Sequence, residues 1–225
     1  QTSYTLYGLS FREFLEFENV IHYPAIPLDD LLQNHVRHAM QIVKDAKVTL
    51  HFENYLEYGY YPFYREVGED FVARMREIIS VVIDNDLPAV ENMTFETIQK
   101  VKKLVMIISE RVPFEPKMSE LWTQLATNNE LGLRMIYALD KAQILSLLTS
   151  KAKNYKFLYK PNKMFLGNTN LMHVLCPVVN KGNERETFFN CQLAVNHDVK
   201  HPLKGDFLVD DRFLFEVGGR KKTYE

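Results

Sequence analysis

The sequence has few of the residues that metal and redox sites use. Among its 225 residues it has two cysteines, Cys176 and Cys191, and their spacing fits no metal site. So low a cysteine content makes a reducing compartment the default. No segment approaches the roughly 20 apolar residues of a membrane span, and no signal peptide opens the chain. We therefore expect a cytoplasmic protein that does not contact membranes.

The sequence also lacks a phosphate-binding loop and a large net charge. None of the nine glycines lies in a Gly-rich loop ending in Gly-Lys-Ser or Gly-Lys-Thr, which argues against ATP hydrolysis by these residues alone. A net charge of -2 argues against a protein that coats nucleic acid through bulk charge, but it permits a local basic patch. Because Gln1 replaces an initiator Met and the chain stops just past an expected strand, we expect a fragment of a longer protein.

The residues that are present are typical of a folded globular chain. The sequence is 46% hydrophobic and 25% charged, and it is long enough for two or three small domains. Helical periodicity dominates as far as Ala142, and the pattern becomes mixed α/β from Lys163 onward. We therefore expect a multi-domain, mainly α protein with a small C-terminal α/β domain.

The N-terminal half predicts several helices. Ser10 and Glu13 form a capping box at the start of a short helix, which places Arg12 exposed in its first turn. Pro27 at the first helical position opens a second, amphipathic helix. Longer helices are expected over Phe71–Asp84, largely buried, and over Phe95–Glu110, which is capped by Thr94.

An aromatic run, YGYYPFY at Tyr58–Tyr64, interrupts these helices at Gly59 and Pro62. Five aromatic residues in seven could stack on nucleic-acid bases. Because Arg65 is the cation nearby, we favour the alternative of a packed corner between helices.

Residues 113–160 follow the order of a winged helix-turn-helix, which is helix, turn, helix and hairpin. Ser119 should cap the first helix, Glu130–Ala142 should form the second, and Ile144–Leu148 should pair with Tyr155–Tyr159 in the hairpin. The candidate DNA-binding cations are Arg134 and Lys141 on the second helix and Lys151, Lys153 and Lys156 on the wing. Such domains bind double-stranded DNA or mediate contacts inside larger proteins, and both alternatives stay open.

The stretch Lys204–Lys222 predicts a β-hairpin. Two apolar runs, Phe207–Val209 and Phe213–Val217, flank an acidic turn. Their alternating faces match only if a three-residue loop puts Val209 opposite Phe213.

This register places two carboxylates together. Asp206 should lie directly across from Glu216, with the Cβ atoms roughly 5 Å apart. Beside Arg220, Lys221 and Lys222, the two acids could hold Mg²⁺ against a phosphate. The alternative is a solvated hairpin edge with ordinary charges.

Six motifs occur in the order of a known family. They are LSFREFL at Leu9–Leu15, YLEYGYYPFY at Tyr55–Tyr64, YALDKAQILSLL at Tyr137–Leu148, KMFLGNTNL at Lys163–Leu171, ETFFNCQLA at Glu186–Ala194 and the closing GDFLVDDRFLFEVGGRKK. Together they resemble the C-terminal part of the archaeal and bacterial AAA-like ATPases that carry a DUF4143 region. The resemblance spans essentially the whole chain.

The resemblance implies four segments. Residues 1–20 would be the tail of an ATPase core, 21–112 a helical lid domain, 113–160 the winged helix-turn-helix, and 161–225 an α/β domain resembling PD-(D/E)XK nucleases. ATP binding is implied only through the P-loop core, which is absent here. Arg12 is the one nucleotide-related candidate in this chain.

The resemblance also carries a nuclease constellation onto this sequence. Glu186 matches the acid on the helix, Asp206 the strand aspartate, and Glu216 the acid of the final Glu-x-Lys. In active nucleases the acids bind Mg²⁺ and the lysine orients or activates water. Here Gly218 occupies the lysine position. Lys221, three residues later, is the catalytic cation that could reach back to the acids in place of that lysine. We therefore expect a degenerate domain that does not cleave.

The expected function is a DNA- or partner-binding module of an AAA-like ATPase. One alternative is a Mg²⁺-dependent DNA nuclease that uses Glu186, Asp206 and Glu216. Another is a structural protein-interaction module, with a protein partner or self-association as its contact.

Overall fold

The computed structural model describes residues 5–150 and 160–218. The described chain is mainly helical, with two small antiparallel sheets, as the sequence predicts. Lys151, Lys153, Lys156, Lys221 and the strand expected at Tyr155–Tyr159 lie outside the described residues. None of the described helices is both long enough and apolar enough to cross a membrane.

The chain divides into two compact units, Gln1–Phe71 and Val72–Glu225. This division cuts across the helical lid expected over residues 21–112. The four domain types implied by the resemblance stay predictions, and the two units are described separately below.

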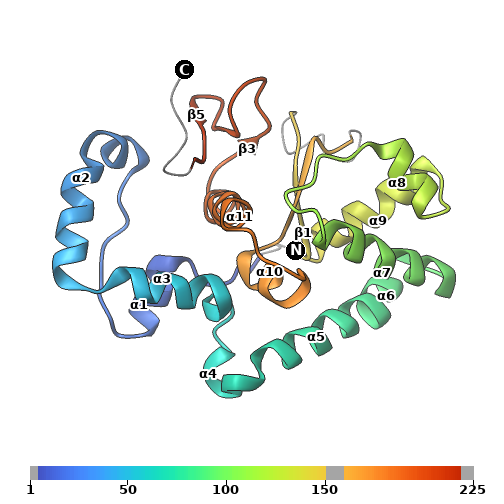
Figure 1. Cartoon of the computed structure of the whole chain (residues 1–225), viewed down its shortest axis with the longest axis horizontal. Coiled ribbons are helices and arrows are strands. Elements are labelled where there is room, and N and C mark those ends of the chain that lie inside the picture. Colours follow the sequence, from blue (N-terminus) through green and yellow to red (C-terminus); the bar gives the residue numbers. More distant parts are fainter. Residues whose placement is uncertain (1–4, 151–159, 219–225) are drawn as a thin grey trace, which may run out of the picture. The chain divides into compact units, whose positions relative to one another are not determined.

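The first unit is helical (Figure 1). Its elements are α1 (Phe11–Phe17), α2 (Leu28–Asp45), α3 (Val48–Asn54), the π-helical turn η1 (Tyr55–Gly59), α4 (Tyr64–Val67) and the 3₁₀ turn η2 (Gly68–Asp70). The capping box of Ser10 and Glu13 is confirmed at the start of α1. Pro27 is the N-cap of α2, so the helix begins at Leu28, one residue later than expected.

Aromatic side chains form the core of the first unit. The rings of Phe14 and Tyr55 lie 5.5 Å apart, and Phe14 also stacks near Tyr64 at 5.8 Å. Gly59 is required here because a Cβ would lie 2.7 Å from the Phe14 ring. The aromatic run is therefore a packed corner, which was the favoured alternative.

Helix α2 is amphipathic as predicted, but its apolar side is largely exposed. Val36, Met40 and Val43 are between 60% and 71% exposed. Asn34 departs from helical backbone angles and kinks the helix. Its side chain and that of His38 both contact Asp30 across the kink.

The second unit contains the remaining elements. They are α5 (Phe71–Val81, which begins at the unit boundary), the π-helical turn η3 (Val82–Asp86), α6 (Leu87–Glu91), α7 (Phe95–Ser109), α8 (Met118–Gln124), α9 (Asn129–Lys141), β1 (Leu145–Leu148), β2 (Lys163–Leu166), α10 (Thr169–Leu175), α11 (Lys181–Leu193), β3 (Val199–Lys200), β4 (Phe207–Val209) and β5 (Phe213–Phe215).

The helix expected over Phe71–Asp84 is shorter and less buried than predicted. It ends at Val81, and the chain continues through the π-helical turn into α6. Met75 and Ile79 are buried, whereas Val72 and Ile78 are each 37% exposed. The N-cap of the next helix is confirmed, because the Thr94 side chain accepts a hydrogen bond from the Thr97 N–H.

Helix α9 packs against α8 and also against strand β1 (Figure 1). A Cβ on Gly132 of α9 would lie 2.5 Å from the Trp122 ring, so glycine permits the close contact with α8. The Asn128 side chain caps α9. The N-cap of α8 is Lys117 rather than the expected Ser119.

Among the described residues β1 is paired with β2, and the pairing expected with Tyr155–Tyr159 lies outside them. Strand β1 pairs with β2, so that Leu145 lies opposite Leu166 and Leu148 opposite Lys163. The backbone N–H and carbonyl of Phe114 both form hydrogen bonds with the backbone of Met164. These bonds add an isolated bridge on the other side of β2. The hairpin therefore closes beyond the boundary expected at residue 160.

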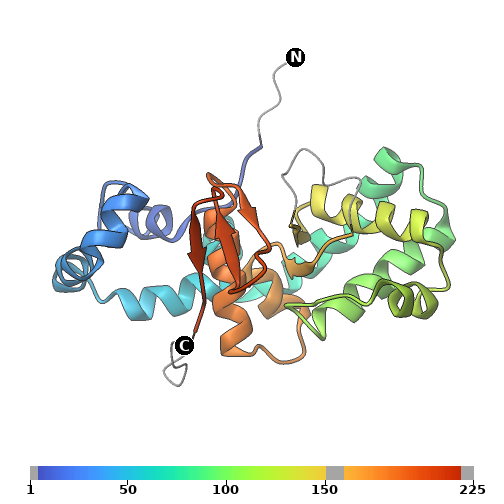
Figure 2. The same cartoon turned by 90° about the horizontal axis from the view of Figure 1, so that it is seen from above.

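The C-terminal part packs helix α11 on a three-stranded antiparallel sheet in the order β3-β4-β5 (Figure 2). Phe189 of α11 lies 5.1 Å from both Phe207 and Phe215 by ring centroids. Phe207 is fully buried and also contacts Phe165 of β2 at 5.8 Å. Strands β2 and β4 thus share one core with α11.

Candidate functional site

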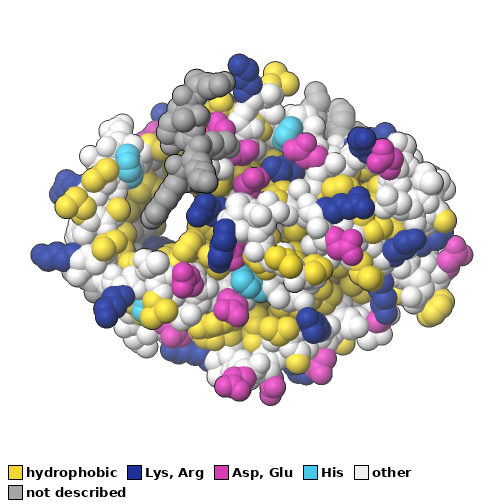
Figure 3. Space-filling view, viewed as in Figure 1, with side chains coloured by type: hydrophobic (Ala, Val, Ile, Leu, Met, Phe, Trp, Pro, Cys, Tyr) yellow, Lys and Arg dark blue, Asp and Glu magenta, His cyan; other side chains and the backbone are white. Residues whose placement is uncertain are grey.

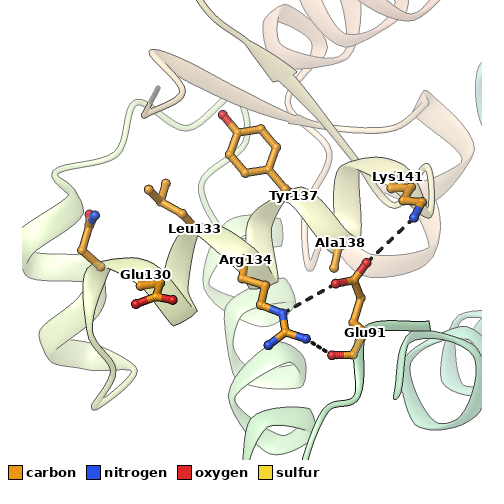
Figure 4. Close-up of a pocket in the computed structure, with 8 residues that line it drawn as sticks. Glu91, Glu130, Leu133, Arg134, Tyr137, Ala138 and Lys141 are labelled. Atoms are coloured by element: carbon orange, nitrogen blue, oxygen red, sulfur yellow. Dashed lines mark hydrogen bonds and ion pairs between the residues drawn. The ribbon is translucent and has the colours of Figure 1, made fainter. Parts of the chain in front are cut away.

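The outer face of α9 carries two of the predicted DNA-binding cations, Arg134 and Lys141 (Figure 4). Both contact Glu91, the last residue of α6. Arg134 Nε lies 3.6 Å from Glu91 Oε2, and Lys141 Nζ lies 3.9 Å from Glu91 Oε1. The Arg134 guanidinium also donates a hydrogen bond to the Glu91 backbone carbonyl. The structure thus brings the two cations together around one carboxylate that the sequence analysis did not single out.

A hollow of about 480 Å³ lies along α9, and its lining includes the apolar side chains of Leu133 and Ala138, the ring of Tyr137, and the polar residues Asn129 and Glu130. Burial, and then the charge of Asp140, raise the pKa of Tyr137 to about 12, so this phenol is protonated at neutral pH. The face therefore combines apolar side chains with charges of both signs.

Glu186, the first predicted nuclease acid, lies on α11 and contacts Lys163 of β2. The Lys163 ammonium donates a hydrogen bond to Glu186 Oε2 at 2.6 Å, and Lys163 is 9% exposed. A half-buried carboxylate and a buried ammonium at this distance neutralise each other. An internal cation therefore lies against the acid that an active nuclease would direct at a metal.

The hairpin register is confirmed, because Val209 lies opposite Phe213 and Phe207 opposite Phe215. The pairing stops there. The Asp206 N–H donates to the Phe215 carbonyl, one residue out of this register, and the preceding Gly205 has a φ of +78°. The expected direct pair of Asp206 with Glu216 is therefore wrong, because the turn at Gly205 shifts the chain.

The Asp206 side chain has a structural contact in this arrangement. Its Oδ2 accepts a hydrogen bond from the Val217 N–H at 2.6 Å, which ties the start of β4 to the end of β5. Glu216, the residue directly before Val217, is exposed. Lys221 is outside the described residues, so its reach toward these acids stays a prediction.

The described acids do not form a cage for Mg²⁺. Within residues 5–150 and 160–218, no group of three or more His, Cys, Asp or Glu side chains is arranged to hold a metal ion. Glu186 is engaged by Lys163, and Asp206 is engaged by Val217. As they stand, these residues do not fit the Mg²⁺ site that the resemblance implies.

His201 is a further polar residue near these acids that sequence reasoning missed. Its Nδ1 is buried and has no hydrogen-bond partner among the residues that the structure describes, while its backbone N–H donates to the Thr149 carbonyl. Burial lowers the pKa of His201, and the charges of Glu115, Lys163 and Asp206 act on it from neighbouring segments. The Lys-Met-Phe-Leu pattern of β2 was a possible signal for Lys163, since it begins a fully buried strand with a lysine. No comparable signal existed for His201.

Arg12 lies in the first unit, exposed as predicted. Its guanidinium is 3.5 Å from Glu16 of the same helix and 3.5 Å from the Tyr23 carbonyl. These long contacts hold it against its own unit, and its relation to a nucleotide stays a prediction.

No family model matches the sequence, and neither a curated protein nor a solved structure matches it. The resemblance to the DUF4143 ATPases therefore rests on the six sequence motifs.

Proposed function

We propose that the chain is the lid, winged-helix and nuclease-like portion of an AAA-like ATPase of the DUF4143 kind. In this proposal it binds duplex DNA through the exposed face of α9 and does not cleave it. The observation that carries the proposal is the order of elements around α9. Helix α7, the Phe114 bridge, α8, α9 and the β1–β2 hairpin follow one another as in a winged helix-turn-helix.

The Phe114 bridge supports this interpretation because a hairpin with a third, short strand beside it is typical of winged helices. In such domains the second helix of the helix-turn-helix enters the major groove. Here that helix is α9, and its exposed side presents Arg134 and Lys141. Both side chains are of the type that contacts phosphates and base edges.

The C-terminal elements support a nuclease-like but inactive domain. A helix followed by a three-stranded antiparallel sheet, α11 and β3-β4-β5, is compatible with the core implied by the resemblance. The contacts of Glu186 with Lys163 and of Asp206 with Val217 leave these acids in structural roles. Gly218 in place of the lysine of Glu-x-Lys adds to the case against cleavage.

The binding proposal is tested by fluorescence anisotropy of a labelled 20-base-pair duplex at several salt concentrations. Each phosphate contact contributes a slope of about -0.9 to the plot of log affinity against log salt. We expect Arg134→Ala/Lys141→Ala to weaken binding and to reduce the magnitude of this slope by about 2. An unchanged slope in the double variant would contradict binding through α9.

A second candidate function is binding of a protein partner on the same face of α9. The observation that favours it is the apolar part of the hollow's lining at Leu133 and Tyr137. In addition, Lys and Arg side chains are interspersed with Asp and Glu on the face in Figure 3, instead of gathering in one basic area. Absence of duplex binding even at 50 mM salt would favour this candidate, because phosphate contacts strengthen at low salt.

A further inference from the structure

Glu91 lies at the point where α6 ends. Asn92, the next residue, has a left-handed backbone with φ of +49°, so the chain turns away directly after Glu91. The Glu91 side chain is 25% exposed and is directed at α9 (Figure 4). A short helix and its turn thus deliver one carboxylate to the face that would meet DNA.

This carboxylate reaches both cations. Arg134 and Lys141 are seven residues apart, or about 10.5 Å along the axis of a helix. Glu91 lies between them, with one oxygen toward each, and its backbone carbonyl adds a third contact with Arg134. A DNA phosphate would use the same guanidinium and ammonium donors.

We propose that Glu91 is an internal competitor of DNA phosphate, which holds Arg134 and Lys141 in a latched state until it is displaced. The proposal rests on the proposed function and adds a regulatory contact to it. Carboxylate and phosphate are both anions that accept hydrogen bonds from Arg and Lys, so the two cannot engage the same donors fully at once.

The contacts of Glu91 with Arg134 and Lys141 are weak enough for a DNA phosphate to displace the carboxylate. The distances of 3.6 and 3.9 Å are long for ion pairs, and the Arg134 and Lys141 side chains are 48% and 72% exposed. Exposed ion pairs of this kind contribute little and are screened by salt. Glu91 therefore lowers duplex affinity without abolishing it.

The variant Glu91→Gln tests the latch because it removes the charge and keeps the size and the backbone carbonyl contact. At 100 mM salt we expect Glu91→Gln to bind a labelled 20-base-pair duplex about fivefold more tightly than the parent chain. Glu77→Gln is the matched control, since it removes one negative charge from another exposed ion pair of the second unit, that of Glu77 with Arg74 on α5. The control should change affinity by about twofold or less. Fluorescence of the single tryptophan, Trp122, reports whether each variant is folded.

The outcomes distinguish failure of the Glu91 latch from failure of the proposed DNA binding. If the parent binds, Arg134→Ala weakens binding and Glu91→Gln binds no more tightly than Glu77→Gln, the latch is wrong and the DNA function stands. If neither the parent nor Glu91→Gln binds the duplex at 50 mM salt, the proposed function itself is wrong.

Discussion

Lys163 contacts the Glu186 carboxylate at 2.6 Å from within strand β2, where it is 9% exposed. An unpaired charge at such a position is costly, whereas a paired one is tolerated. We therefore expect Lys163→Met to destabilise the second unit by about 3 kcal/mol, because it leaves Glu186 without its partner. Urea unfolding followed by Trp122 fluorescence measures this loss.

The double variant Lys163→Met/Glu186→Gln is the control. It removes the uncompensated carboxylate, so most of the lost stability should return. If the single and double variants are equally unstable, Lys163 acts through packing and the ion pair is not the reason for its position.

Glu184 provides a prediction on pH. It is 1% exposed on α11, and burial opposes its charged form, but hydrogen bonds from His173 and Lys181 outweigh burial and lower its pKa. A carboxyl with a lowered folded-state pKa stabilises the fold fully above its unfolded pKa, about 4.3, and loses that contribution as the pH falls through the folded value.

The parent should therefore lose stability more steeply than Glu184→Gln below a pH of about 4.3. Urea midpoints of the two chains between pH 7 and pH 3 measure the difference. Glu130→Gln, an exposed acid in the same unit, should retain the steep profile of the parent. Parallel profiles for Glu184→Gln and the parent would show that Glu184 does not contribute this acid sensitivity.

The sequence predicted the local contacts of residues better than the distant ones. The capping side chains of Ser10, Thr94 and Asn128 act within three residues, and a local pattern identifies Ser10 and Thr94 as caps. The contact of Glu91 with Arg134 joins residues 43 positions apart. A single sequence contains no local signal for such a pair.

At the scale of elements, α9 depends on a close helix contact. Gly132 faces the Trp122 ring, and a Cβ there would lie 2.5 Å from it. We expect Gly132→Ala to destabilise the second unit by about 1–3 kcal/mol, since overpacking forces the ring or the helix to move. A thermal or urea melt followed by Trp122 fluorescence checks this value.

Gly182 is the matched control for this substitution, because it is also a helical glycine of the second unit. Its nearest neighbour to a Cβ is a single Asn180 side-chain oxygen at 3.2 Å. Gly182→Ala should change stability by less than about 1 kcal/mol. Equal effects of the two substitutions would contradict a special role for the contact with Trp122.

The two hairpins show what strand patterns can and cannot predict. Alternation in Phe207–Val209 and Phe213–Phe215 correctly gave their register, because the loop between them is short. The pairing of β1 with β2 was not predicted, because β2 lies more than a dozen residues further along the chain. Asp206 was misplaced because the positive φ of Gly205 ends the regular ladder, and alternation does not report such a turn.

For the molecule as a whole, the account predicts DNA binding without cleavage. Supercoiled plasmid incubated with the chain and Mg²⁺ or Mn²⁺ should remain intact. Calorimetric titration of either ion should match the blank, Asp206→Ala/Glu216→Ala, because Glu186 and Asp206 already have internal partners. Cleavage that disappears in this double variant would instead establish the Mg²⁺-dependent nuclease alternative.

The class of fold followed from the sequence, because helical periodicity and short strands are local properties. The division into units did not. The chain separates after Phe71, the first residue of α5 and directly after the Gly68–Asp70 turn, whereas the boundaries expected from the sequence lie near residues 20 and 112. The boundary depends on contacts between distant residues, which one sequence does not report.

Hydrogen exchange of the chain, measured with and without a 20-base-pair duplex, tests whether α9 is the DNA-binding surface. We expect added duplex to slow exchange in α9, over Asn129–Lys141, and Arg134→Ala/Lys141→Ala to remove this protection. Protection confined to the sheet β3-β4-β5, or none at a saturating duplex concentration, would contradict the assignment of α9 as the DNA-binding surface.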